Sequence, residues 1–122
     1  MSLTPSQRLC DPLDVAIANG AALSIAYNLK GRVPAGIYMP AAWTAANLTF
    51  QVSQDGVTYY DMHTSGGEYS LITSAGIFLP LTAENFFGAN FIKVRSGTSG
   101  TPVNQGADRA LVLMCGFPYP AH

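Results

Sequence analysis

One strand followed by a tight reversal constrains this chain more than any other feature. Residues 47–53 alternate apolar and polar side chains, which is the two-residue period of a half-buried β-strand. Asp55 and Gly56 come next, a pair that favours a hairpin turn, and residues 57–62 return with β-forming residues. The sequence therefore predicts a β-hairpin here. Within it, we expect the ring of Tyr59 to pack in the core.

Strand-like segments recur along the chain, separated by turn signals about every 8 to 12 residues. Residues 14–18 and 22–29 flank Asn19 and Gly20, so we expect them to pair as a first hairpin. Further strands are expected at 36–39, 69–73, 76–81, 90–96 and 109–115, with one helical turn within 82–89 between Thr82 and Gly88. About eight strands predict an all-β fold, a single jelly-roll-like antiparallel β-sandwich.

The length of 122 residues suits one domain. Residues 1–12 contain two prolines and no periodic pattern, so they are interpreted as an extended N-terminal arm. The sandwich is expected over residues 13–116. Residues 117–122 alternate proline with aromatic residues and are interpreted as an extended C-terminal tail.

Charge is scarce, and this limits the possible partners. Charged residues make up 11% of the chain, against about a quarter in ordinary soluble domains. Such a surface is poorly protected from association, so we expect it to be covered by partners and the protein to be a homo-oligomer. The net charge of −1 supports neither nucleic-acid binding nor attraction to an anionic membrane. We see no secretion signal and no stretch of membrane-spanning length, and we expect folding in the cytoplasm.

Two cysteines, Cys10 and Cys115, lie near opposite ends of the chain. They could form a disulfide if the terminal strands are neighbours. The alternative is two unpaired cysteines with Cys115 buried in a strand, which the absence of a secretion signal favours.

Residues suited to catalysis are sparse, so we expect no enzyme, no cofactor and no metal site. The chain has seven acidic residues, and Asp55 and Asp108 lie where aspartate shapes a turn. His63 is the internal histidine, and it opens a glycine-containing loop. Exposed aromatic rings could instead stack on a sugar, and Trp43 and Tyr60 are the candidates for such a glycan contact.

Contact with a partner is predicted at three places. Residues 97–107 form the longest run of loop-forming residues, and loops of this length are usually functional. Residues 109–115 are apolar on both faces, so their outward side should meet a neighbour. With the two ends of the chain, these segments give the predicted contact residues: Leu9, Thr101, Pro102, Val103, Asn104, Leu111, Leu113, Phe117 and Tyr119.

The motifs YMPAAWTAANLTFQVSQDGVTYYDM and FIKVRSGTSGTPVNQGADRALVL carry a resemblance to known proteins. Over about three-fifths of its length, residues 37–109, the chain resembles small β-sandwich proteins encoded in the structural gene clusters of tailed bacteriophages. The LTFQVSQDG and FIKVRS segments also resemble discoidin-type jelly-roll modules, many of which bind carbohydrate.

The phage resemblance implies a non-enzymatic virion component. A capsid decoration or cement protein fits best, one that binds the assembled head through the major capsid protein or another virion protein. The alternative is a carbohydrate-binding β-sandwich module, such as a head-fibre, neck or tail component that contacts host glycans.

Overall fold

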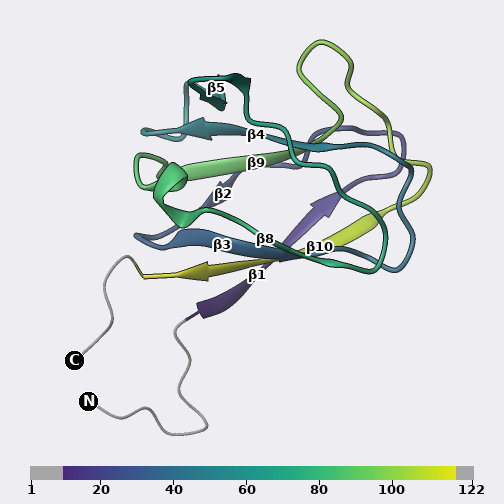
Figure 1. Cartoon of the computed structure of the whole chain (residues 1–122), viewed down its shortest axis with the longest axis horizontal. Coiled ribbons are helices and arrows are strands. Elements are labelled where there is room, and N and C mark those ends of the chain that lie inside the picture. The colour runs from purple at the N-terminus through teal and green to yellow at the C-terminus, as the bar shows by residue number, and fades with distance from the viewer. Residues whose placement is uncertain (1–9, 118–122) are drawn as a thin grey trace, which may run out of the picture.

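Two antiparallel four-stranded sheets face each other in the computed structural model, which describes residues 10–117 (Figure 1). Sheet A has the order β1 (Cys10–Ile17), β10 (Arg109–Gly116), β3 (Val33–Tyr38) and β8 (Phe78–Pro80). Sheet B has the order β2 (Tyr27–Asn28), β9 (Phe91–Ser96), β4 (Leu48–Ser53) and β5 (Tyr60–Asp61). A two-stranded ribbon, β6 (His63–Thr64) with β7 (Gly67–Glu68), and the 3₁₀ turn η1 (Ala83–Phe86) complete the fold.

The chain crosses repeatedly from one sheet to the other. Strands β1, β3, β8 and β10 lie in sheet A, and the strands between them in sequence lie in sheet B or in the ribbon. This winding, with the first and last strands paired in one sheet, is that of a jelly roll. The predicted all-β, antiparallel sandwich is therefore confirmed.

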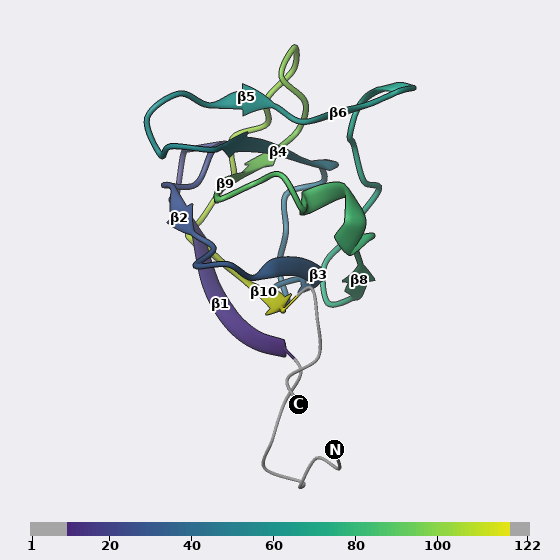
Figure 2. The same cartoon turned by 90° about the vertical axis from the view of Figure 1, so that its left-hand side faces the viewer.

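The two sheets lie face to face (Figure 2), and the alternation of side chains along their strands builds the core between them. In β4, Leu48 and Phe50 are buried inward, while Thr49 faces the outer side of sheet B. Phe86 reaches the same core from η1, and its ring meets Phe50 edge-on at 5.5 Å between centroids. Aromatic pairs in this geometry contribute beyond the area they bury.

The central hairpin exists, but its turn is wider than the sequence predicts. β4 pairs with β5 only at Gln51 with Asp61 and Val52 with Tyr60. Asp55 accepts hydrogen bonds from the amides of Val57 and Thr58, which shapes a loop in place of a two-residue turn. These bonds hold the pKa of the Asp55 carboxyl below its ordinary value.

The placement of Tyr59 in the core is wrong. The ring lies half-buried on the outer side of sheet B, with Lys93 Nζ 4.2 Å from its centroid. The strand register explains this. Tyr60 pairs with Val52 and lies on the same, inner side of sheet B. Tyr59 precedes Tyr60 in the chain and therefore points to the outer side.

The predicted first hairpin is also wrong. β1 pairs along its whole length with β10, from Cys10 opposite Gly116 to Ile17 opposite Arg109. The turn at Asn19 and Gly20 instead carries the chain from sheet A to sheet B. Eight residue pairs with a distant strand outweigh the local turn signal, and the segment 22–29 supplies only the short β2 and one bridge.

Two smaller expectations are also wrong, and a third is confirmed with a shifted end. Residues 69–73 form no strand, since Leu71 alone makes a bridge, to Leu48. The helical turn is confirmed as η1 after Thr82, although Phe87 occupies the C-cap position expected for Gly88. Strand β1 begins at Cys10, so residues 10–12, which were expected to belong to the N-terminal arm, are part of sheet A. Residues 1–9 and 118–122 lie outside the described residues.

The cysteines are both free, as the second alternative predicts. Cys10 lies opposite Gly116 and Cys115 opposite Asp11, so strand alternation directs the two thiols to opposite faces of sheet A. Cys115 is buried, and burial raises the pKa of its thiol to about 11.

We expect only Cys10 to react rapidly with a thiol reagent in the folded protein. At pH 8 about one Cys115 in a thousand would be thiolate, given a pKa of about 11. Mass spectrometry after a timed pulse of iodoacetamide should place the label on Cys10, at a rate at least about 100-fold above that of Cys115. Unfolding in guanidinium is the control, in which both residues should react. Equal labelling in the native state would contradict the buried position of Cys115.

Candidate functional site

The loop between β9 and β10 projects past the outer side of sheet B (Figures 1 and 2). Its tip closes on itself, because the amides of Thr98 and Thr101 each donate to the other's carbonyl oxygen, at 3.1 and 3.2 Å. Below the tip, the amide of Val103 donates to the carbonyl of Ser96. We call residues 98–104 the projecting loop. It is an ordered structure rather than a loose connection.

Glu68 anchors the first half of the projecting loop. Its carboxylate accepts a hydrogen bond from the amide of Ser99, with N–O distances of 3.3 and 3.1 Å to the two oxygens. The same carboxylate receives Arg95 Nη2 at 2.7 Å. The β6–β7 ribbon, which carries Glu68, thus connects the loop to the central strands of sheet B.

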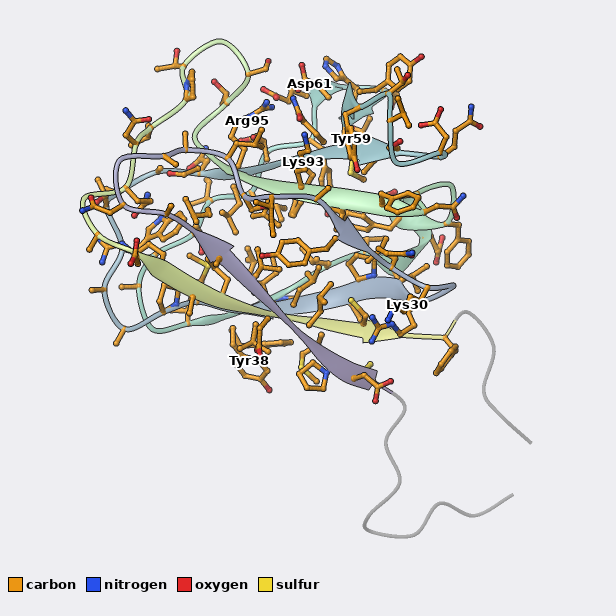
Figure 3. All side chains as sticks on the ribbon, turned by 180° about the vertical axis from the view of Figure 1, so that it is seen from behind. Lys30, Tyr38, Tyr59, Asp61, Lys93 and Arg95 are labelled. Carbon is orange, nitrogen blue, oxygen red and sulfur yellow. The ribbon has the colours of Figure 1, made fainter. Side chains whose placement is uncertain are left out.

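Arg95 is a buried cation whose side chain donates hydrogen bonds to residues of three other strands (Figure 3). Its side chain is 7% exposed, and it also donates from Nη1 to Asp61 at 3.0 Å and from Nε to the hydroxyl of Thr49 at 2.9 Å. For Asp61, partial burial opposes ionisation, but the hydrogen bond and charge of Arg95 outweigh it and lower the pKa of that carboxyl. Every arm of the guanidinium is therefore used to hold the fold.

Gln105 anchors the second half of the loop. Its side chain is 1% exposed, its amide nitrogen donates to Ser96 Oγ and to the Thr44 carbonyl, and its amide oxygen accepts from the Thr44 amide and from Arg109 Nε. Arg109 Nη2 in turn donates to the hydroxyl of Thr44. A buried amide with its hydrogen bonds satisfied fixes the backbone that carries it.

The predicted contact residues of the loop are accessible. Thr101, Pro102 and Asn104 are exposed, and Val103 is half-buried. Because the loop is anchored at both ends, it holds these side chains in one place. The anchors, Glu68 and Gln105, are residues of the candidate site that sequence reasoning missed. A lone glutamate in a glycine-containing loop and a glutamine among loop residues give no signal of their own.

Leu111 and Leu113 are not available to a partner, which corrects their prediction as contact residues. Both are 1% exposed and belong to the sandwich's own core. Since β10 is apolar on both faces, the sequence alone does not show which of its alternate residues point outward. Phe117 is exposed just beyond β10, whereas Leu9 and Tyr119 lie outside the described residues.

The side chains of β10 that point outward lie on the outer side of sheet A. We call this surface the apolar face. Val112 and Met114 lie at its centre, beside Tyr38 and Gly36 of β3. Tyr38 points away from the sandwich on the side opposite Arg95 and Lys93 (Figure 3). By strand register, the full face comprises Cys10, Pro12, Asp14, Ala16, Gly36, Tyr38, Phe78, Pro80, Ala110, Val112, Met114 and Gly116.

The two glycan candidates differ in their surroundings. Trp43 is half-buried against the core, and its indole N–H already donates to the carbonyl of Ala46. Tyr60 is 65% exposed at the edge of sheet B, beside an open hollow that it lines with Val52, Ser53, Gln54 and Gly88. Of the two, only Tyr60 therefore offers a free aromatic ring.

No protein-family model and no curated protein matches the sequence.

Within residues 10–117, no three of the side chains that commonly bind metals gather into a potential site. His63 is exposed in β6. No helix among these residues is long and apolar enough to cross a membrane.

Gly97, at the base of the projecting loop, is expected to tolerate no side chain. Its φ is +87°, and an added Cβ would lie 2.5 Å from the carbonyl oxygen of Thr101 and 2.7 Å from the amide of Val103. Gly97→Ala should therefore lower the free energy of unfolding by about 2–3 kcal/mol, measured by urea titration. Gly100→Ala, in the same loop, is the matched control, since nothing lies within 4 Å of its Cβ position. Equal effects of the two substitutions would show that the loop is not fixed in this conformation.

Proposed function

We propose that this protein is a non-enzymatic structural component of a tailed-bacteriophage virion, a decoration or cement protein that binds the assembled head. The observation that carries the proposal is the projecting loop, whose uncharged tip is held at both ends by Glu68 and Gln105. The entropy of ordering such a loop is lost on folding rather than on binding, which favours tight attachment.

The partners in this proposal are the major capsid protein or other virion proteins, and the protein resides in the virion. Its mechanism is mass action. A protein that binds only the assembled shell stabilises that shell by its binding free energy, to an extent set by its concentration relative to Kd. Its buried charged and polar side chains, such as Arg95 and Gln105, hold the scaffold, and the accessible loop residues make the contact. Since the same fold hosts many functions, the loop supports the proposal more than the jelly roll does.

The direct test is binding to particles. Purified phage particles should contain the protein at a fixed ratio to the major capsid protein, measured by quantitative mass spectrometry. Particles lacking the protein should bind added protein saturably and become more resistant to heating.

A double substitution, Thr101→Glu with Asn104→Glu, should weaken particle binding at least about 10-fold, because it places charge in a contact that is uncharged. Val57→Glu, on the exposed turn between β4 and β5, is the control and should bind normally. A wild-type protein that is absent from particles and does not bind them would refute the proposal.

A second candidate function rests on Tyr60. A carbohydrate-binding module would use this exposed ring beside its hollow as a stacking platform for a sugar. Retention on immobilised glycans that is lost in Tyr60→Ala would favour it. Trp43→Ala is not an equivalent test, since that ring packs against the core.

A further inference from the structure

The turn between β1 and sheet B contains Asn19 followed by Gly20. Asparagine is a thermolabile residue, most of all before glycine, because glycine has no side chain to hinder its own amide nitrogen. The other asparagines of the chain precede leucine, phenylalanine or glutamine. Asn19 is exposed, and no hydrogen bond joins its side-chain amide to another described residue. Water and base therefore reach this side chain.

Loss of the side-chain amide of Asn19 needs only water and a base. The base removes the amide proton of Gly20, and the nitrogen attacks the side-chain carbonyl carbon, Cγ, of Asn19. The bond from Cγ to the side-chain nitrogen breaks, and this nitrogen takes up a proton and leaves as ammonia. Water then opens the resulting five-membered imide at either carbonyl. The product is aspartate, or isoaspartate, in which the main chain runs through the former side-chain carbonyl.

The fold restrains the attacking nitrogen. The amide of Gly20 donates to the carbonyl of Gln105 at 2.8 Å, and the amide of Gln105 donates back to the carbonyl of Ala21 at 3.0 Å. The turn itself is closed by a bond from the Ala21 amide to the Ala18 carbonyl at 2.9 Å. With φ of +80° at Gly20, this is the geometry of a type II turn. The proton that a base must remove is thus held in a hydrogen bond, and attack requires the contact with Gln105 to open.

Asp108 restrains the other side of the reacting pair. Its Oδ1 accepts a hydrogen bond from the amide of Asn19 at 2.7 Å. Asp108 and Gln105 both follow the projecting loop, and Gln105 is 1% exposed, with its side-chain amide bonded within the fold. The turn is therefore attached to the segment that anchors the second half of the loop.

We infer that Asn19 is a site of spontaneous deamidation whose rate is controlled by the contact between the 18–21 turn and Gln105. The native protein reacts only during local openings that free the amide of Gly20. Its rate is then the rate in the unfolded chain multiplied by the open fraction. Since the same opening frees the backbone of Gln105, deamidation of Asn19 measures how often the second anchor of the projecting loop opens.

Conversion to isoaspartate weakens this anchor. It adds one carbon to the main chain between the Cα of residue 19 and Gly20, which shifts Gly20 relative to Gln105. It also leaves the former main-chain carbonyl as a free carboxylate on the Cα of residue 19, whose amide is bonded to Asp108. Carboxylates this close repel each other. Both changes oppose the contact between the turn and Gln105.

Mass spectrometry of the purified full chain tests the site and its control by the fold. Deamidation raises the mass of the tryptic peptide 9–30, and fragmentation assigns the change to Asn19 rather than to Asn28. At pH 8, Asn19 in the native protein should convert at least about 10-fold more slowly than in the same chain unfolded in guanidinium. Equal rates would overturn the inference, as would an Asn19 that stays intact in the unfolded chain.

A pair of aspartate substitutions tests the turn contact. Asp108→Ala removes the acceptor of the Asn19 amide and should accelerate deamidation in the native protein at least about 3-fold, as loss of one hydrogen bond would. Asp14→Ala is the matched control. It removes an exposed carboxylate from β1 and should leave the rate within about 2-fold of the wild type. An Asp108→Ala variant that reacts no faster than Asp14→Ala overturns the role of the contact. Circular dichroism establishes that both variants are folded.

Hydrogen exchange of the converted protein, separated by chromatography, tests the effect on the loop. The amide of Gln105 should exchange at least about 10-fold faster than before conversion. The amide of Ser99, which Glu68 holds in the first half of the loop, should not change. Unchanged protection of Gln105 would overturn the inferred release. Since no virus particle is needed, this inference and the proposed virion function can fail separately.

Discussion

Replacing Phe86 with alanine is expected to lower the free energy of unfolding by about 3–5 kcal/mol, which is the usual cost of removing a buried phenylalanine ring. The ring is fully buried and joins the core from η1 rather than from a strand. It meets Phe50 edge-on at 5.5 Å and Tyr69 at 5.8 Å between centroids. Its removal leaves a cavity beside Phe50 and Tyr69.

Phe87 provides a matched control for this substitution. It follows Phe86 directly, but its ring is 57% exposed. Phe87→Ala should change the free energy of unfolding by at most about 0.5 kcal/mol, as surface substitutions do. Urea unfolding of the two variants and the wild type measures both values. Comparable losses would mean that η1 does not insert Phe86 into the core.

Local patterns predicted the structure wherever the local signal and the final pairing agree. The alternation in β4 gave the correct inward side, because the two-residue period is a property of the strand itself. The capping pattern near Thr82 likewise predicted the turn η1. The Asn19 and Gly20 pair was misleading, since a hairpin there competes with eight residue pairs between β1 and β10 that no local signal reveals.

The candidate site was predictable only in part, for a related reason. The length of the loop and its turn-forming residues indicated an accessible segment, and Thr101 and Asn104 are indeed exposed. Its anchors depend on contacts between distant residues, such as Glu68 with Ser99. In β10, both parities are apolar, so the sequence could not distinguish the buried Leu111 and Leu113 from the outward Val112 and Met114.

The charged outer side of sheet B shows the same limit. The sequence predicts a strand over residues 90–96 with Lys93 and Arg95 on one face. The fold separates the two cations: Lys93 lies over the ring of Tyr59, while Arg95 is covered by the elements that carry Asp61 and Glu68. The burial of Arg95 depends on the path of residues 54–68 across the sheet, which no local pattern specifies.

Removing the Arg95 side chain is therefore expected to have the second large effect. Arg95→Ala should lower the free energy of unfolding by about 3 kcal/mol, because it leaves a buried carboxylate without its cation. Most of this loss is assigned to Glu68, whose side chain is 16% exposed. Asp61 is 37% exposed, so water screens its interaction with Arg95 and its contribution is small. Thermal unfolding should show a Tm lower by about 10 °C.

Lys93→Ala is the control, as it removes a cation from the same strand and the same outer side. Its contact with Tyr59 is expected to contribute only about 0.5–1 kcal/mol.

A second measurement separates loss of the network from general destabilisation. The amide of Ser99 donates to Glu68, so its hydrogen exchange should accelerate in Arg95→Ala more than that of Val103, whose amide donates to the backbone of β9. If Arg95→Ala cost no more than Lys93→Ala and left Ser99 protected, the Arg95 network would not be what holds the projecting loop, and other contacts would have to account for the order of the loop on which the proposed capsid contact depends.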